Sequence, residues 1–156
     1  MANIYDPQFD LERDEPPYVW RRAWLGRQAG SERLGASLFE IAPGAQTFPV
    51  HAHLHNEELV IVVSGSPTLR DGEGRERTLA PGEVVAFPAG PSGAHGLRND
   101  TADPVRVLLV STMVAPEVNV FPETGELRIR DYVPGTDAPD GAFDVHAARL
   151  SASQGD

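Results

Sequence analysis

The sequence predicts an all-β fold, a barrel or a sandwich, for most of its 156 residues. From Arg33 onward, short runs of strand-forming residues alternate with turns rich in Gly and Pro. No segment of helical length in this region carries apolar residues at the spacing of an amphipathic helix. The length suits one domain with a single well-filled core, and no internal repeat is visible.

The expected strands begin and end at recognisable turn residues. Leu59–Val63 has β-branched residues at four of its five positions and is closed by Gly65, so we expect a fully buried strand. The sequence Asp-Gly-Glu-Gly at 71–74 predicts a hairpin turn. The other strands are expected at Leu34–Ile41, Thr68–Arg70, Arg75–Leu79, Val84–Phe87 and Val105–Ser111, with weaker edge strands at Val118–Phe121 and Leu127–Ile129.

The two ends of the chain differ in composition from the middle. We expect an extended N-terminal arm over residues 1–32, a barrel domain over 33–115 and a partly irregular C-terminal extension over 116–156. Within the extension, residues 134–156 have the composition of a tail that is poorly ordered or lies over the surface. The fold is therefore expected to be one barrel with loose ends.

The N-terminal arm carries Trp20 and Trp24 among several arginines. Both tryptophans are too apolar to be left in water, so we expect them to pack on the domain or on a second subunit. A sharper alternative makes Arg21 or Arg22 a clamp for an anionic ligand, although nothing in the spacing favours it. Because an open barrel leaves edge strands, the arm is also suited to cover one of them, and we predict a homodimer.

Composition limits the partners. The net charge of −10 argues against a nucleic-acid or anionic-membrane binder, because phosphate binding relies on Lys and Arg. The absence of cysteine excludes disulfides and thiolate metal sites, so any metal must be held by His and carboxylate. The acidic N-terminal segment lacks the basic start and apolar run of a signal peptide, and we expect a cytoplasmic protein whose partner is a small molecule.

The segment Gly44–Gly65 holds three of the five histidines. Side chains alternate along a strand, so His51 and His53 face the same way and can bind one ion. Glu58 can reach the same ion after a short turn. Its neighbour Glu57 is the rival, since only one of the two faces inward, and the count back from the glycine that ends the strand favours Glu58.

Two linked motifs over roughly residues 34–112 resemble those of the cupin superfamily. The segments NEELVIVVSG, FPAGPSGAH and VRVLLVST are similar to the corresponding segments of small stand-alone bacterial cupins of unassigned activity. Two spacings depart from the family pattern. Six residues rather than five separate Gly44 from His51, and four rather than two separate Gly90 from His95. The matching residues are Gly44, His51, His53, Glu58 and Gly65 in the first motif, and Gly82, Pro88, Gly90, His95 and Asn99 in the second.

The resemblance implies a conserved β-barrel, a jelly roll or double-stranded β-helix, with one divalent metal ion per chain. In this sequence the implied metal ligands are His51, His53, His95 and Glu58. Imidazole and carboxylate ligands suit Mn, Fe, Co, Ni, Cu or Zn. The competing interpretation is a set of buried, hydrogen-bonded histidines.

Other residues are expected to have simpler roles. His55 lies in a turn and His146 in the tail, so both are expected to be solvated rather than to bind metal. Asn99 is expected to hold the loop of His95. Three large apolar residues are expected in the core or lining the pocket: Phe48, Phe87 and Leu97.

Three functions fit the sequence. The first is a metal-dependent enzyme, an oxygenase, isomerase or lyase acting on a small oxygen-bearing metabolite. The second is a non-catalytic module that binds or senses a small molecule or a metal. The third is a metal-free, epimerase-like protein that uses histidine as a base. The fold cannot choose among these, because the same barrel carries many chemistries.

Overall fold

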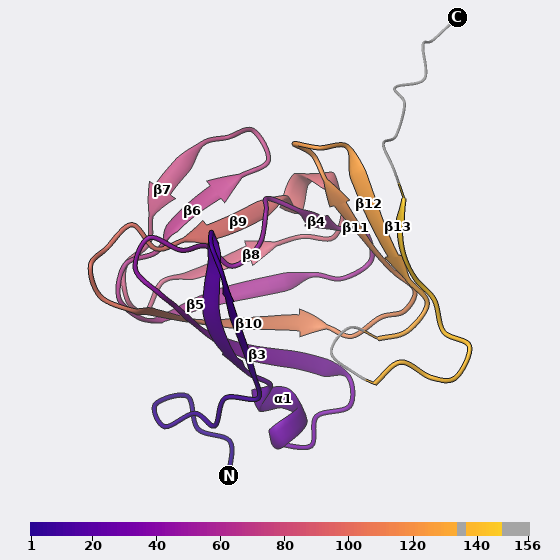
Figure 1. Cartoon of the computed structure of the whole chain (residues 1–156), viewed down its shortest axis with the longest axis horizontal. Coiled ribbons are helices and arrows are strands. Elements are labelled where there is room, and N and C mark those ends of the chain that lie inside the picture. The colour runs from indigo at the N-terminus through magenta and orange to yellow at the C-terminus, as the bar shows by residue number, and fades with distance from the viewer. Residues whose placement is uncertain (134–136, 148–156) are drawn as a thin grey trace, which may run out of the picture.

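The computed structural model describes residues 1–133 and 137–147, which form antiparallel sheets with little helix (Figure 1). The predicted all-β class is confirmed. The largest sheet has the strand order β1-β2-β3-β10-β5-β8. Its strands are β1 (Leu11–Glu15), β2 (Tyr18–Ala23), β3 (Leu34–Ile41), β10 (Val105–Thr112), β5 (Glu58–Ser64) and β8 (Val84–Phe87).

Two smaller sheets complete the fold, with the orders β13-β12-β11-β4 and β7-β6-β9. The only α-helix in the described part of the chain is α1 (Leu25–Gln28), and none there is long and apolar enough to cross a membrane. A single 3-10 turn, η1 (Pro91–Gly93), precedes β9. The strands are β13 (Asp144–Ala147), β12 (Glu126–Arg130), β11 (Glu117–Phe121), β4 (Ala52–His53), β7 (Glu76–Thr78), β6 (Thr68–Asp71) and β9 (His95–Arg98).

Strand β5 sets the direction in which the candidate carboxylate points. Val60 and Val62 are buried in the core, whereas Leu59 is 37% exposed on the other face. The prediction of a fully buried strand is therefore wrong, because the other face of β5 is only partly covered, with Val63 packed against a second apolar cluster. Glu58 shares the inward face with the two valines, since side chains two residues apart point the same way.

The N-terminal arm contains a hairpin that was not predicted. Strands β1 and β2 pair with each other, and β2 continues onto β3, with Trp20 opposite Ile41. Trp20 is buried, its Nε1 donates to the Thr47 carbonyl at 3.0 Å, and its ring packs edge-on against Phe39. The arm therefore covers the edge of β3 within its own chain, and the homodimer stays a prediction.

The C-terminal extension is also more regular than expected. Strand β13 lies in the segment predicted to be irregular and pairs with β12. Its short polar sequence carries little strand signal, and an ion pair between Arg128 and Asp144 joins it to β12. Strand β11 pairs with β4, which places Asn119 opposite His53. The prediction for residues 134–136 and 148–156 lies outside the described residues.

Two features of the second motif have structural roles. Gly90 has a φ of 100°, a conformation that favours glycine, at the turn that leads into η1. The prediction that Asn99 holds the loop of His95 is wrong. Nδ2 of Asn99 donates to the carbonyls of Ile41 and Asp103, at 3.0 and 2.9 Å, and therefore joins the end of β3 to the start of β10.

We predict that Asn99→Ala lowers the free energy of unfolding by about 2–3 kcal/mol, because it removes the amide that donates to the Ile41 carbonyl and the oxygen that accepts from the Thr101 N–H. Asn99 is 0% exposed, so water cannot replace the lost amide. Urea denaturation of the two proteins measures the difference. Asn3→Ala, at an exposed asparagine, is the control and should change stability by less than about 0.5 kcal/mol. Equal stability of parent and Asn99→Ala would contradict the role assigned to the amide.

Candidate metal centre

Three of the predicted ligands converge at one end of β4 and β5. Ligand atoms of His51, His53 and Glu58 all lie within 4.8 Å of one another. The rings of the two histidines have centroids 4.9 Å apart, as expected for side chains two residues apart on an extended segment. This group has the donor types and the proximity that a divalent metal ion requires.

His95 lies beside this group but is not part of it. Its backbone pairs with that of His51 through two hydrogen bonds of 3.0 and 2.9 Å, and its ring stacks on Phe87 at 3.7 Å. Its Nε2 is 3.2 Å from Oε2 of Glu58. The structure therefore brings all four predicted ligands together and places three of them at mutual distances suited to one ion.

Backbone carbonyls fix the orientation of two imidazoles. Nδ1 of His51 lies 2.9 Å from the carbonyl of Pro49, and Nδ1 of His95 lies 2.9 Å from that of Gly93. A carbonyl can only accept, so each Nδ1 carries the hydrogen and a neutral ring has its lone pair on Nε2. A neutral imidazole binds a metal through one ring nitrogen, and the hydrogen bond that the other nitrogen donates fixes the orientation of the ring.

The charges of the group suit a cation. Burial, reinforced by the neighbouring His95 and His53, lowers the pKa of His51 to about 3, so this ring is neutral at physiological pH. Burial opposes ionisation of Glu58, but contacts with His53 and His95 hold its pKa well below the usual value. The site therefore offers a neutral imidazole next to an ionised carboxylate.

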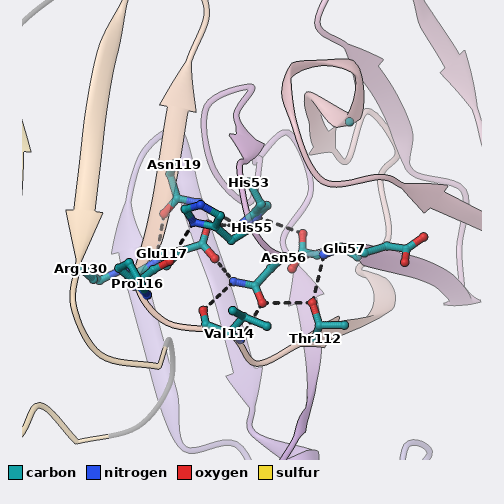
Figure 2. Close-up of polar contacts among 12 residues, drawn as sticks. His53, His55, Asn56, Glu57, Thr112, Val114, Pro116, Glu117, Asn119 and Arg130 are labelled. Carbon is teal, nitrogen blue, oxygen red and sulfur yellow. Dashed lines mark hydrogen bonds and ion pairs between the residues drawn. The ribbon is translucent and has the colours of Figure 1, made fainter.

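A second buried carboxylate, not found from the sequence, supports His53. Glu117 is 0% exposed, and its Oε1 lies 3.2 Å from Nδ1 of His53. Figure 2 shows Asn56 between Glu117 and Thr112: its Nδ2 donates to Glu117, and its Oδ1 accepts from the Thr112 hydroxyl at 3.0 Å. Nδ2 also donates to the Val114 carbonyl at 3.0 Å, and Oδ1 also accepts from the Val114 N–H at 2.8 Å. Asn56 therefore fixes the carboxylate that faces His53.

The contacts of His53 test whether the residues fit a metal. Burial would lower its pKa, but Glu117 and Glu58 raise it to about 9. Nδ1 also lies 2.9 Å from Nδ2 of Asn119, and one ring nitrogen cannot donate to Glu117 and accept from an amide at once. Donation to the ionised carboxylate fits the raised pKa. Nε2 is buried, has no hydrogen-bond partner among the described residues and lies 3.2 Å from Oε2 of Glu58, so the residues fit an ion held between them.

The remaining polar candidates lie outside the group. Glu57 is exposed, and its backbone N–H donates to the Thr112 hydroxyl at 3.1 Å. His55 is exposed and hydrogen-bonded to the Pro116 carbonyl at 2.9 Å (Figure 2). His146 is exposed on β13. Of the two adjacent glutamates, the structure places Glu58 with the histidines.

The group opens into a cavity of about 320 Å³. This volume is at the lower end of the range for small-molecule sites. Phe48 and Leu97 line the cavity, which is one of the two roles predicted for them. Phe87 is a buried core residue, the other predicted role, and its ring stacks on His95. Strands β2, β11 and β12, outside the predicted barrel, contribute further lining residues: Arg22, Glu117, Asn119, Phe121, Arg128 and Arg130.

A sequence signal for these residues exists, but it is weak. Glu117, Asn119 and Phe121 alternate with valines along β11, and Arg128 and Arg130 are likewise two positions apart on β12. The alternation indicates a polar face on each strand. On a hairpin read in isolation, such a face is expected to be in water.

Comparisons with known proteins show what this chain resembles. The Cupin domain family model matches residues 37–111. A sugar phosphate isomerase from a cupin superfamily, from Silicibacter pomeroyi, is similar in structure with a TM-score of 0.77 and 24% identity, and 97% of each chain is covered. That likeness confirms the predicted double-stranded β-helix and concerns the fold alone. A comparison with curated proteins gave no significant match.

Two solved structures share 28% sequence identity with this chain. One, from Acidithiobacillus ferrooxidans, is named as a candidate sugar phosphate isomerase; the TM-score is 0.71, with 80% of this chain and 79% of that chain covered. The other is the polyketide cyclase RemF from Streptomyces resistomycificus, with a TM-score of 0.62 and coverages of 78% and 84%. These proteins are what the chain resembles in sequence and in fold.

We predict near-stoichiometric divalent metal in the purified protein, measured by elemental mass spectrometry without a metal-binding tag. His51→Ala, His53→Ala and Glu58→Gln should each lose the ion, because each removes a donor atom. Glu117→Gln should weaken affinity by about 10- to 100-fold, as loss of an outer partner does. His55→Ala, an exposed histidine outside the group, is the matched control and should keep the metal. Retention in all of these variants would contradict the site.

We also predict that metal affinity rises with pH. With its pKa raised to about 9, His53 carries a proton in the metal-free protein below that pH, and an ion binding at Nε2 must displace it. His51, with a pKa of about 3, needs no deprotonation. Affinity for Co²⁺, followed by its visible absorption between pH 6.5 and 8.5, should fall by up to about tenfold for each unit of acidification. Affinity independent of pH over this range would contradict the assignment.

Proposed function

The chain belongs to the cupin superfamily, and from that premise we propose that it is a divalent-metal-dependent enzyme acting on a small oxygen-bearing metabolite. One observation carries this proposal: the donor atoms of His51, His53 and Glu58 converge at a cavity of about 320 Å³. A bound ion would supply Lewis acidity, activation of water or a redox centre. The proposed resident group is one ion per chain.

The residues of the chain supply orientation and shielding. Backbone carbonyls hold His51 and His95, and Glu117 holds His53, so the three rings are positioned before any ligand enters. Phe48 and Leu97 provide apolar walls to the cavity beside the polar group. A substrate that offers oxygen atoms to this end would be held in one orientation.

Among the reaction classes, we favour an isomerase or lyase over an oxygenase. The two solved relatives at 28% identity are named as a candidate sugar phosphate isomerase and a polyketide cyclase. Lysine Schiff-base chemistry is excluded, because the sequence contains no lysine. His95 is proposed as the fourth ligand, and its place outside the group of three makes proton transfer its alternative role.

The second candidate is a non-catalytic module that binds or senses a small molecule or a metal. It is favoured by the lining of the cavity, which in the described residues contains no tyrosine or lysine that could act as a separate base. Asn56 and His53 hold Glu117 in a closed network, which leaves it little freedom to move protons. A ligand that is bound tightly and released unchanged would support this candidate.

We predict turnover by the metal-loaded protein with a panel of hydroxycarbonyl compounds and sugar phosphates. Proton NMR in D₂O detects both a new isomer and deuterium incorporation next to a carbonyl. Chelation and His53→Ala should abolish turnover, and His55→Ala should retain it. His95→Gln separates the two roles of His95: loss of metal assigns it as a ligand, and retained metal without turnover assigns it proton transfer. Absence of turnover with every reloaded ion would favour the non-catalytic module.

A further inference from the structure

The cavity contains two arginines that have no carboxylate partner among the residues that the structure describes. Arg22 comes from β2 and Arg130 from β12, which belong to different sheets. Two other arginines that line the same cavity are each paired with an aspartate, Arg27 with Asp137 and Arg128 with Asp144. Arg27 and Arg128 are therefore neutralised by protein carboxylates, whereas Arg22 and Arg130 are available to bind a ligand.

Arg22 is held in place by hydrogen bonds that use only some of its N–H donors. Its Nε and Nη2 donate to the Ser37 hydroxyl at 3.1 and 2.8 Å, and its guanidinium lies 5.1 Å from the ring centre of Phe39 and 5.5 Å from that of Trp24. A guanidinium has five N–H donors, and no other protein acceptor is recorded for this one within the described ranges. Burial lowers the pKa of Arg22 to about 10, which leaves it cationic at physiological pH.

Arg130 has an unsatisfied donor beside the metal centre. Its Nη2 donates to Oδ1 of Asn119 at 3.0 Å, and the Asn119 amide contacts His53 on its other side (Figure 2). Its Nε is buried and has no hydrogen-bond partner in the described part of the chain. Glu117 is its cross-strand neighbour, yet the two form no ion pair there, because Glu117 is bound to His53 and Asn56. A buried donor of this kind implies an acceptor from outside the chain.

The balance of charge points to an anion. With a divalent ion held by Glu58 and neutral histidines, the metal group has one net positive charge, and Glu117 offsets it. Arg22 and Arg130 then leave the buried part of the cavity with an excess of two positive charges, since the remaining lining carboxylate, Glu32, is exposed. The acidic net charge of the whole protein does not remove this excess, because exposed charges are screened by solvent.

We propose that the cavity binds a small metabolite with an oxyanion group, a carboxylate or a phosphate, that Arg22 and Arg130 bind together. Oxygen atoms at the other end of the metabolite would face His51, His53 and Glu58. This inference rests on the proposed function and adds the class of substrate to it. Arginine is suited to the role, since its planar fork matches the geometry of both oxyanions.

Isothermal titration of the metal-loaded protein tests the proposal, with malate and 2-phosphoglycolate as anionic probes and glycerol as the neutral comparison. Arg22→Met and Arg130→Met should each lower the affinity for the more tightly bound anionic probe by about 10- to 100-fold, because each removes a charged hydrogen bond. Metal content should be unchanged, because neither arginine is a ligand. Arg27→Met, which removes a cavity arginine already paired with Asp137, is the matched control and should bind as the parent does.

The outcomes separate this inference from the proposed function. If glycerol binds as tightly as the anions, or if both variants bind within about twofold of the parent, the anion site is wrong even when metal is bound and turnover is seen. If the protein takes up no metal, titration of the chelated protein with inorganic phosphate still tests the site, and loss of binding in both variants supports it. Should Arg22→Met fail to fold, Arg130→Met and Arg22→Lys decide: the first should lose the anion, and the second should retain part of the affinity.

Discussion

Two carboxylates inside the cavity, on opposite sides of one imidazole, are the constraint on which the rest of the site depends. Glu58 comes from the large sheet and Glu117 from the sheet that β4 shares with the C-terminal strands, and His53 lies between them with contacts of 3.2 Å to both. A buried carboxylate that loses a partner costs free energy, so the imidazole, which contacts both carboxylates, stabilises the two sheets together. The arrangement joins the sheets, and it also leaves Nε2 of His53 directed at the candidate metal position.

Much of this site follows from local rules that the sequence displays. The two-residue spacing of His51 and His53 places both rings on one face of an extended segment, and they lie together as expected. Strand parity also placed Glu58, rather than Glu57, on the inward face of β5. The bounds of β3 and β8 are those predicted, because turn residues end both strands and apolar residues fill them. Within the described residues, the candidate metal donors are therefore a local property of two strands and a turn.

The support of these donors could not be predicted in the same way. Glu117 and Arg130 lie on a hairpin whose polar face would be in water if the hairpin stood alone, and only its pairing with β4 turns that face toward the cavity. Such long-range pairing depends on where the sheets meet, and no local pattern encodes it. The same holds for β2, whose pairing with β3 brings Arg22 to the cavity, although no sequence pattern favours Arg22 over Arg21. Arg21 faces outward and pairs with Glu40 instead.

The origin of the cavity residues suggests a division of labour along the chain. The four predicted ligands lie within residues 37–111, the part that matches the family, whereas Arg22, Glu117 and Arg130 lie outside it. Among the described residues that line the cavity, the matched part contributes the candidate metal donors and no charged side chain beyond them. The added strands supply the cations and the buried carboxylate, so they set the charge of whatever ligand the cavity accepts. The proposed metal binding and the proposed choice of ligand would then vary separately, because the residues assigned to them are held by different strand pairings.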